Sequence, residues 1–268
     1  MIKDITIGQY FPGKSPVHRL DARLKILLTI AFIVMLFIAD DIKGLCVGIG
    51  FTFITFLISR IPLKMMWKSI KPIFIIILIT ALLNLFFVHT GTPYFEWKFI
   101  KITDKGVETA VFMVVRIICL IVGTSLLTYT TSPIDLTDAI ERLLSPLKKI
   151  KVPVHELAMM MTIALRFIPT LLEETDKITC AQKARGADME TGSLFKRAKA
   201  LIPILIPLFV SSFRHAEELA LAMECRCYHG GEGRTRMKQL RFKLIDLWGT
   251  LYLTCFFAGV IVINHFCK

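Results

Sequence analysis

Long apolar runs separated by short polar segments form the dominant pattern along the chain. A helix needs about 20 apolar residues to cross the hydrocarbon core of a bilayer. Five runs approach or reach this length, at residues 24–39, 45–58, 72–88, 107–129 and 247–264. The shorter ones are expected to stand nearly upright or to extend into their flanks. The pattern predicts an all-α polytopic membrane protein with about five transmembrane helices.

Residues 131–243 follow a different pattern, in which apolar positions recur among many charges. Ser132 is suited to cap a short amphipathic helix that Pro133 begins. This helix is expected to stop near Pro146 or Pro153. The organisation predicted from the sequence is therefore an N-terminal tail with four spans, a central helical domain and a last span, at residues 1–130, 131–243 and 244–268.

Two long helices are predicted inside the central domain, at residues 154–185 and 193–228. Their apolar residues recur at gaps of three and four, the period of a one-sided helix. At 1.5 Å per residue each helix would be roughly 50 Å long, more than one membrane thickness. Three prolines are expected to kink these helices: Pro169, Pro203 and Pro207. Charged or titratable groups in the first helix would be costly at bilayer depth: His155, Glu156 and Arg166. We therefore expect both helices to lie at or below the cytoplasmic face.

Composition and charge agree with a membrane protein. The chain of 268 residues is 54% hydrophobic, and its mean hydropathy is +0.63. Its formal net charge of +12 would suggest nucleic acid in a soluble protein, but in a membrane protein it reflects basic cytoplasmic loops. The N-terminal tail and the loop at 60–71 are basic and are assigned to the cytoplasm, as is the central domain. We expect a multi-pass protein of the cell membrane that binds no nucleic acid.

Two tripeptides, each with one arginine between small residues, stand near the ends of the two long helices. The first is Ala184, Arg185 and Gly186 within AQKARGAD, and the second is Cys225, Arg226 and Cys227 within AMECRCYHGG. Small neighbours let a partner approach closely, and a planar guanidinium can bind a carboxylate through two hydrogen bonds. Each arginine alone could equally be a solvated charge that favours the helix dipole. Their recurrence favours docking to two similar partners.

Three stretches resemble the transmembrane (T) component of energy-coupling factor transporters, the vitamin-importing ABC type. They are IGQYFPGKSPVHRLDARLK, MTIALRFIPTLLEETDKITCAQKARGAD and PLFVSSFRHAEELALAMECRCYHGGEGRTR, and the resemblance extends over nearly the whole chain, from residue 7 to about residue 236. The resemblance implies that the long helices are coupling helices, each ending in an X-Arg-X signature that docks on one of two ATPase subunits. Cys225 departs from the alanine that is commoner before the arginine, but cysteine is also small and tolerates burial.

The resemblance also implies a third partner, a small membrane protein that captures the substrate. The apolar faces of the coupling helices would hold it, and closure of the ATPases would shift the helices and topple it. The residues assigned to this contact are Leu157, Met161, Leu205, Phe209 and Phe213. The chain itself would need no cofactor, because the ATPase partners bind ATP.

Other functions find less support in the same residues. The sequence has no Ser/His/Asp set, no H-E-x-x-H and no phosphate-binding G-x-x-x-x-G-K-[ST], so we do not expect an enzyme. Cys225, Cys227 and His229 could ligate a metal, although their spacing is not a common one for zinc. Arg116 in the fourth span could belong to a substrate or proton path, or it could equally lie near a helix end or be paired within the bundle, with Asn84 or Thr124 as its evident supports.

Two alternative transport functions remain open at this point. A secondary transporter would need polar residues at mid-membrane or interrupted helices in matching halves, whereas these spans are largely apolar. The permease of a conventional ABC importer normally uses one coupling loop, whereas this chain has two arginine signatures. The histidine, aspartate and arginine near the start, His18, Asp21 and Arg23, resemble the family's N-terminal motif and by themselves indicate a capped helix start.

Overall fold

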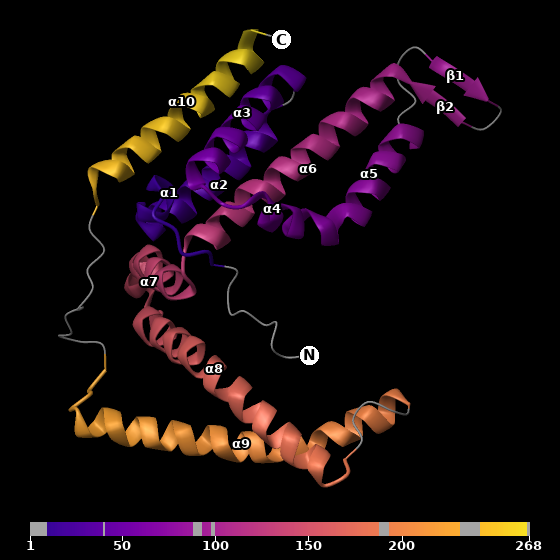
Figure 1. Cartoon of the computed structure of the whole chain (residues 1–268). Coiled ribbons are helices and arrows are strands. Elements are labelled where there is room, and N and C mark those ends of the chain that lie inside the picture. The colour runs from indigo at the N-terminus through magenta and orange to yellow at the C-terminus, as the bar shows by residue number, and fades with distance from the viewer. Residues whose placement is uncertain are drawn as a thin grey trace. The chain divides into compact units, whose positions relative to one another are not determined.

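The computed structural model describes residues 10–39, 41–87, 93–97, 100–187, 193–230 and 242–266. This part of the chain is helical apart from one small antiparallel hairpin, so the predicted all-α class is confirmed (Figure 1). The elements are α1 (Pro16–Arg19), α2 (Ala22–Ile38), α3 (Ile42–Ser59), α4 (Leu63–Ile70), η1 (Lys71–Ile73), α5 (Phe74–Phe87), β1 (Pro93–Trp97), β2 (Ile100–Thr103), α6 (Asp104–Thr130), α7 (Pro133–Leu144), η2 (Ser145–Ile150), α8 (Val154–Ala184), α9 (Leu194–Cys225) and α10 (Leu244–Phe266).

Contacts divide the chain into two compact units. The bundle unit comprises Gly8–Leu136 and Leu240–Lys268, and the long-helix unit contains Thr137–Gln239. The first residues of α7 belong to the bundle unit and the rest to the long-helix unit. Each unit is described below by itself.

Helices α2, α3, α6 and α10 pack around the core of the bundle unit. The core residues are Phe32, Met35, Leu36, Ala39, Leu45, Phe51, Cys119, Leu253 and Val260. Two glycines allow close helix contacts there. A β-carbon on Gly48 would lie 2.6 Å from Leu36, and one on Gly123 would lie 2.1 Å from the ring of Phe32. Tight packing between apolar helices therefore depends on the missing side chains at these two positions.

Six helical segments in the described part of the chain are long and apolar enough to cross a membrane. They are Ile42–Ser59, Leu63–Phe87, Asp104–Thr130, Val154–Ala184, Phe195–Cys225 and Leu244–Phe266. The predicted span at 72–88 is lengthened, because α4, η1 and α5 join into one segment. The predicted span at 24–39 corresponds to α2, which has only 17 residues. Helices α8 and α9 are the least apolar of the six, and their cytoplasmic location stays a prediction.

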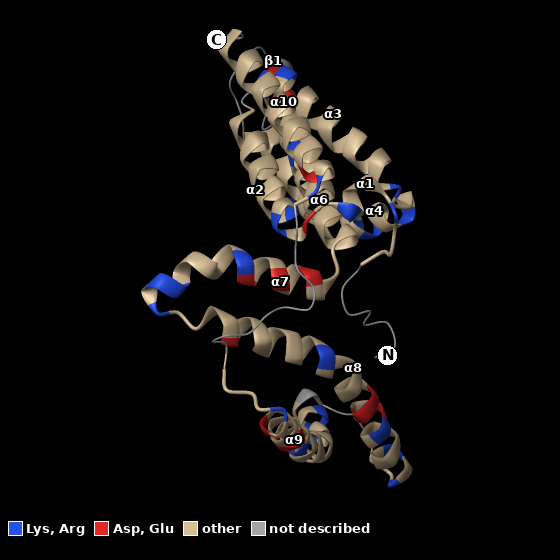
Figure 2. Cartoon of the chain, turned by 90° about the vertical axis from the view of Figure 1, so that its left-hand side faces the viewer, with Lys and Arg blue, Asp and Glu red and all other residues tan. Residues whose placement is uncertain are grey.

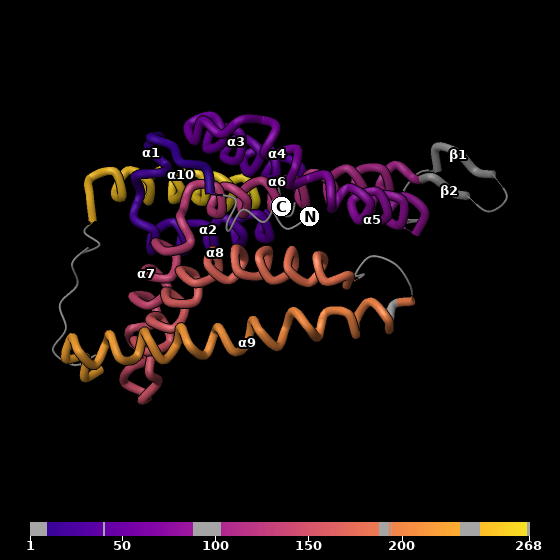
Figure 3. Tube along the Cα trace, turned by 60° about the horizontal axis from the view of Figure 1, so that its bottom comes forward, coloured from indigo at the N-terminus to yellow at the C-terminus, as the bar shows by residue number. Residues whose placement is uncertain are grey.

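The long-helix unit is built on α8 and α9, with 31 and 32 residues. The two helices run in opposite directions (Figure 3), and their contacts match that order: Gln182 of α8 donates to the Pro203 carbonyl at 3.4 Å, and Phe167 stacks on His215 with ring centroids 5.9 Å apart. Both helices continue through their internal prolines. Their bounds lie within three residues of the ranges predicted from the apolar spacing.

Candidate functional site

The two arginines of the tripeptides occupy the same position in two matching helix ends. Arg185 follows the last residue of α8, and Arg226 follows the last residue of α9. After each arginine the chain closes with two backbone hydrogen bonds of the Schellman type. In α8 they run from Gly186 N to Lys183 O and from Ala187 N to Gln182 O, both 3.0 Å.

The end of α9 has the same two backbone hydrogen bonds at the corresponding positions. Cys227 N donates to Glu224 O at 2.8 Å, and Tyr228 N donates to Met223 O at 3.1 Å. The residue after the arginine is left-handed in both motifs, with φ 85° at Gly186 and 55° at Cys227. The two tripeptides thus share a backbone conformation as well as a sequence pattern.

All six residues of the tripeptides are exposed: Ala184, Arg185, Gly186, Cys225, Arg226 and Cys227. A β-carbon added to Gly186 would meet nothing within 4 Å. Within the described residues, neither arginine forms an ion pair. Each guanidinium is therefore the largest group at an open helix end, where the unpaired carbonyls favour a cation and small neighbours leave room for a partner.

The residues assigned to contact with a membrane partner are also exposed. Their exposed fractions are 43% for Leu157, 40% for Met161, 46% for Leu205, 62% for Phe209 and 69% for Phe213. Solvent contact of this size is unfavourable for large apolar side chains in water, so such a surface indicates a covering by lipid or protein. Whether a substrate-capturing protein covers it stays a prediction.

A polar cluster that the sequence did not predict joins α8 to α9. Glu174 accepts a hydrogen bond from Ser211, and its other oxygen lies 3.6 Å from His215 Nε2. Phe167 stacks on the same histidine, beside a cavity of about 330 Å³ that is mostly apolar. Ser211 and His215 are four residues apart and so share one helix face, which is the only sequence signal for this contact.

The N-terminal motif does cap helix starts, as predicted. Ser15 Oγ accepts from His18 N before α1, and Asp21 Oδ1 accepts from Arg23 N before α2. The motif also extends to a distant helix, because Asp21 N donates to Asp246 Oδ1 of α10 at 2.8 Å. Asp246 is 3% exposed.

A buried lysine closes the same end of the bundle unit. Lys25 Nζ donates to the carbonyls of Thr130 at 2.8 Å and His18 at 3.2 Å, and to Thr131 Oγ1 at 3.4 Å. Thr130 and Thr131 stand at the end of α6, directly before α7. The lysine therefore fixes the point at which the chain leaves the bundle unit.

Arg116 has a structural contact different from the two that the sequence suggested. Its Nη2 donates to the carbonyl of Ala39, after the last residue of α2, and its guanidinium lies 4.4 Å from the centre of the Phe112 ring. Asn264 of α10 donates to Ile38 O at 2.5 Å. Two side chains from α6 and α10 thus bind carbonyls that the end of α2 leaves without helical partners.

The predicted supports of Arg116 have other partners. Asn84 donates to Thr80 O, and Thr124 donates to Leu120 O. Each of these bonds lies within the residue's own helix, and neither reaches Arg116. The possible metal ligands Cys225, Cys227 and His229 are also not brought together: the described residues contain no group of three His, Cys, Asp or Glu side chains arranged to hold a metal ion.

Comparison with known proteins identifies the family. The sequence profile of CbiQ, described as cobalt transport protein, matches residues 13–237. The energy-coupling factor transporter transmembrane protein EcfT of Clostridium kluyveri is 58% identical over 252 residues, which cover 94% of this chain and 93% of the relative. The protein of that name from Ruminiclostridium cellulolyticum is 54% identical over 265 residues, 99% of each chain. The Bacillus subtilis protein is 48% identical over 240 residues, 90% and 91% of the two chains. The chain therefore belongs to the CbiQ family of cobalt transport proteins and, within it, to the transmembrane (T) components of energy-coupling factor transporters.

Proposed function

We propose that this chain transmits ATP hydrolysis by two ATP-binding cassette ATPase subunits to a small membrane protein that captures vitamins or other micronutrients. The chain is a non-catalytic subunit without a cofactor of its own, and ATP binds to its partners. The relatives, which are named energy-coupling factor transporter transmembrane proteins, support a role as the transmembrane subunit of a transporter. The observation that carries the proposal is the pair of exposed arginines on two matching helix ends.

Each arginine docks on one ATPase subunit. The guanidinium binds a carboxylate in a groove through two charge-assisted hydrogen bonds, and its small neighbours allow the groove walls to approach the helix end. Because Arg185 and Arg226 stand in the same backbone conformation, two ATPase subunits with similar grooves can bind both helix ends. The long-helix unit and the N-terminus lie on the cytoplasmic side, where the ATPases are.

The exposed apolar faces of α8 and α9 hold the substrate-capturing protein. Five large apolar side chains support this contact: Leu157, Met161, Leu205, Phe209 and Phe213. A shift of the helices driven by the ATPases would then move the bound protein. The substrate is set by that protein rather than by this chain.

The docking step is tested by co-purification. The tagged chain is expressed with its two ATPases and its substrate-capturing subunit, solubilised gently, and the recovered ATPase is quantified. Arg185→Glu and Arg226→Glu place a carboxylate against a carboxylate, so each change should lower ATPase recovery at least tenfold, the effect of about 1.4 kcal/mol. The double variant should also lose ATP-driven uptake in vesicles.

Arg166→Glu on α8 and Arg214→Glu on α9 are the matched controls. They reverse an exposed arginine on the same two helices, away from the ends, and should leave ATPase recovery unchanged. The proposal fails if the double variant retains its ATPases and transports as well as the unchanged chain. A wild-type chain that purifies alone and moves a solute unaided would instead support a secondary transporter.

A further inference from the structure

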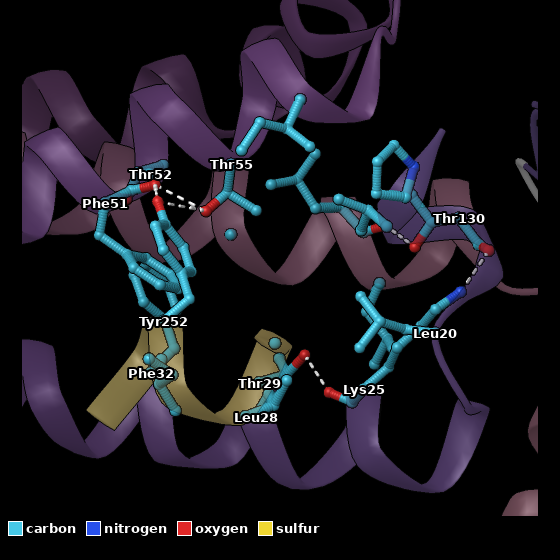
Figure 4. Close-up of a pocket in the computed structure, with 18 of the residues that line it drawn as sticks. Leu20, Lys25, Leu28, Thr29, Phe32, Phe51, Thr52, Thr55, Thr130 and Tyr252 are labelled. Atoms are coloured by element: carbon cyan, nitrogen blue, oxygen red, sulfur yellow. Dashed lines mark hydrogen bonds between the residues drawn. The ribbon is translucent and has the colours of Figure 1, made fainter. Parts of the chain in front are cut away.

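A cavity of about 360 Å³ lies within the bundle unit, between α1, α2, α3, α6 and α10 (Figure 4). Its volume falls at the lower end of the range for small-molecule sites, roughly 300–1,000 Å³. Aromatic and aliphatic side chains form most of its wall, including Leu28, Phe32, Phe51, Leu126 and Trp248. The cavity plays no part in the proposed docking of ATPases.

The polar groups in the wall are already used within the protein. Four threonine hydroxyls donate to carbonyls of their own helices at 2.7–2.8 Å: Thr29, Thr52, Thr55 and Thr130. Tyr252 donates to Phe51 O at 3.3 Å, and the Lys25 ammonium has three oxygen neighbours. The cavity therefore suits an alkyl chain better than a polar solute such as a vitamin, which would need free donors.

One end of the cavity is basic. This end of the cavity is the one at which α2 and α10 begin and α3 and α6 end. Four exposed cations stand within two residues of wall residues along the chain: Lys14, Arg19, Arg60 and Lys243. Figure 2 shows basic residues gathered at this end of the bundle, near α1 and α4.

The acidic side chains at the same end are held by hydrogen bonds inside the protein. Asp21 binds Arg23 at 2.8 Å, Asp135 accepts from Ser132 at 2.7 Å, and Asp246 accepts from the backbone of Asp21. Asp21 and Asp246 are buried. The exposed charge around the cavity is thus positive, which matches an anionic group placed next to an alkyl chain.

We propose that this cavity binds one acyl chain of an anionic phospholipid, with the lipid phosphate at Arg19 and its neighbouring cations. The protein resides in a membrane, so phospholipid is its surrounding solvent, and basic pockets between transmembrane helices bind anionic headgroups. Trp248 stands at the cavity with 69% of its surface exposed, as expected for an indole at the level of the headgroups. A bound lipid would connect the start of α10 with α1, α3 and the end of α6.

Fluorescence quenching tests the proposal on the full chain in vesicles. Trp67→Phe and Trp97→Phe leave Trp248 as the single tryptophan. The vesicles are phosphatidylcholine with a small fraction of phosphatidylglycerol, and the bromine label is carried on the acyl chains of one lipid or the other. Brominated phosphatidylglycerol should quench Trp248 beyond its share of the bilayer, and its preference over phosphatidylcholine should fall about fivefold in Arg19→Gln, the loss of one cation near an anionic headgroup.

Two matched pairs of variants decide the outcome. Thr55→Phe fills the cavity and should abolish the excess quenching, whereas Ile54→Phe, at the residue just before it on α3 but outside the cavity wall, should not. Lys105→Gln is the control for Arg19→Gln. It removes a cation at the other end of α6, away from the basic end of the cavity, and should leave the preference for phosphatidylglycerol unchanged. Equal quenching by both lipids, or unchanged selectivity in both Arg19→Gln and Thr55→Phe, overturns the proposal. If Thr55→Phe does not fold, Arg19→Gln decides alone, because Arg19 is exposed.

Discussion

At the scale of single residues, the two arginine-bearing helix ends differ in the residue that follows the arginine. Gly186 adopts its left-handed conformation at no steric cost, because it lacks a β-carbon. Cys227 has the same kind of conformation with φ 55° and carries a penalty of roughly 1–2 kcal/mol. The hydrogen bonds to Glu224 and Met223 compensate for it.

Replacing Cys227 by glycine should therefore stabilise the end of α9. We expect Cys227→Gly to raise the free energy of unfolding by about 1 kcal/mol, and Gly186→Ala to lower it by a similar amount. Thermal unfolding of the purified chain measures both. Cys225→Ala is the control, since Cys225 lies within the helix, and it should change stability by less than about 0.5 kcal/mol. A Cys227→Gly chain no more stable than Cys225→Ala would contradict this reading.

A second residue-scale prediction concerns His18. Burial lowers its pKa from the usual 6.5, Phe11 O partly offsets this by accepting a hydrogen bond from Nε2, and the charge of Lys25 lowers it further. The unfolded chain therefore binds a proton at higher pH than the folded one, and stability should decline as pH falls below 6.5 until the folded His18 is also protonated. Thermal unfolding should be measured on both sides of pH 6.5. The loss of stability on going to the lower pH should be smaller for His18→Gln than for the control His229→Gln.

At the scale of elements, the packing of α2 on α6 rests on one glycine. The ring of Phe32 lies where a β-carbon of Gly123 would be, and Phe32 is packed in the bundle core and only 3% exposed, so the ring would have to leave its packed position to admit a β-carbon. Gly259 of α10 has its nearest such neighbour, Val47, at 3.9 Å. The two glycines occupy similar helices but differ in how closely the next helix approaches.

Gly123→Ala should consequently destabilise the bundle by about 1–3 kcal/mol, the range for overpacking. Gly259→Ala should be neutral or stabilising, because alanine favours a helix by up to about 1 kcal/mol over glycine. Thermal unfolding in the same detergent compares the two. Adding Phe32→Leu to Gly123→Ala should recover part of the loss, and equal effects of the two alanines would count against the close contact.

The sequence predicted the long elements well and their mutual contacts poorly. Apolar spacing, Pro153 and Ser193 defined α8 and α9 to within three residues, because these signals are local. The Glu174 to His215 contact joins residues 41 positions apart in α8 and α9, and depends on how two helices cross. The hairpin of β1 and β2 was also not predicted, because its alternation of apolar and polar residues, as in Ile100–Thr103, extends over too few residues to be a strong strand signal.

The candidate site shows the same division. Exposure of Arg185 and Arg226 followed from their polar surroundings near helix ends. The shared left-handed turn did not, because cysteine seldom adopts such a conformation. The contact between Arg116 and the end of α2 was missed for a third reason: Ala39 contributes a backbone carbonyl, and a backbone group leaves no mark in the sequence.

At the scale of the whole molecule, the charge pattern assigns both arginine-bearing ends to the cytoplasm and the turn at Asp41 to the outside. In otherwise cysteine-free chains, a membrane-impermeant maleimide should label Cys227 in inverted vesicles but not in intact cells. Asp41→Cys, placed in the exposed turn before α3, should show the reverse. Labelling of both positions from the same side would contradict the predicted topology.

The antiparallel order of α8 and α9 fixes the distance between the two arginines. Gln182, three residues before Arg185, contacts Pro203, and the 23 residues from Pro203 to Arg226 extend over roughly 35 Å of helix. A helix resists stretching, so the distance between Arg185 and Arg226 stays nearly constant as long as α8 and α9 keep their crossing angle. Two partners that change their own separation during a catalytic cycle would therefore have to alter the angle at which α8 and α9 cross, and that change would strain the contact of Glu174 with Ser211 and His215, which joins the two helices.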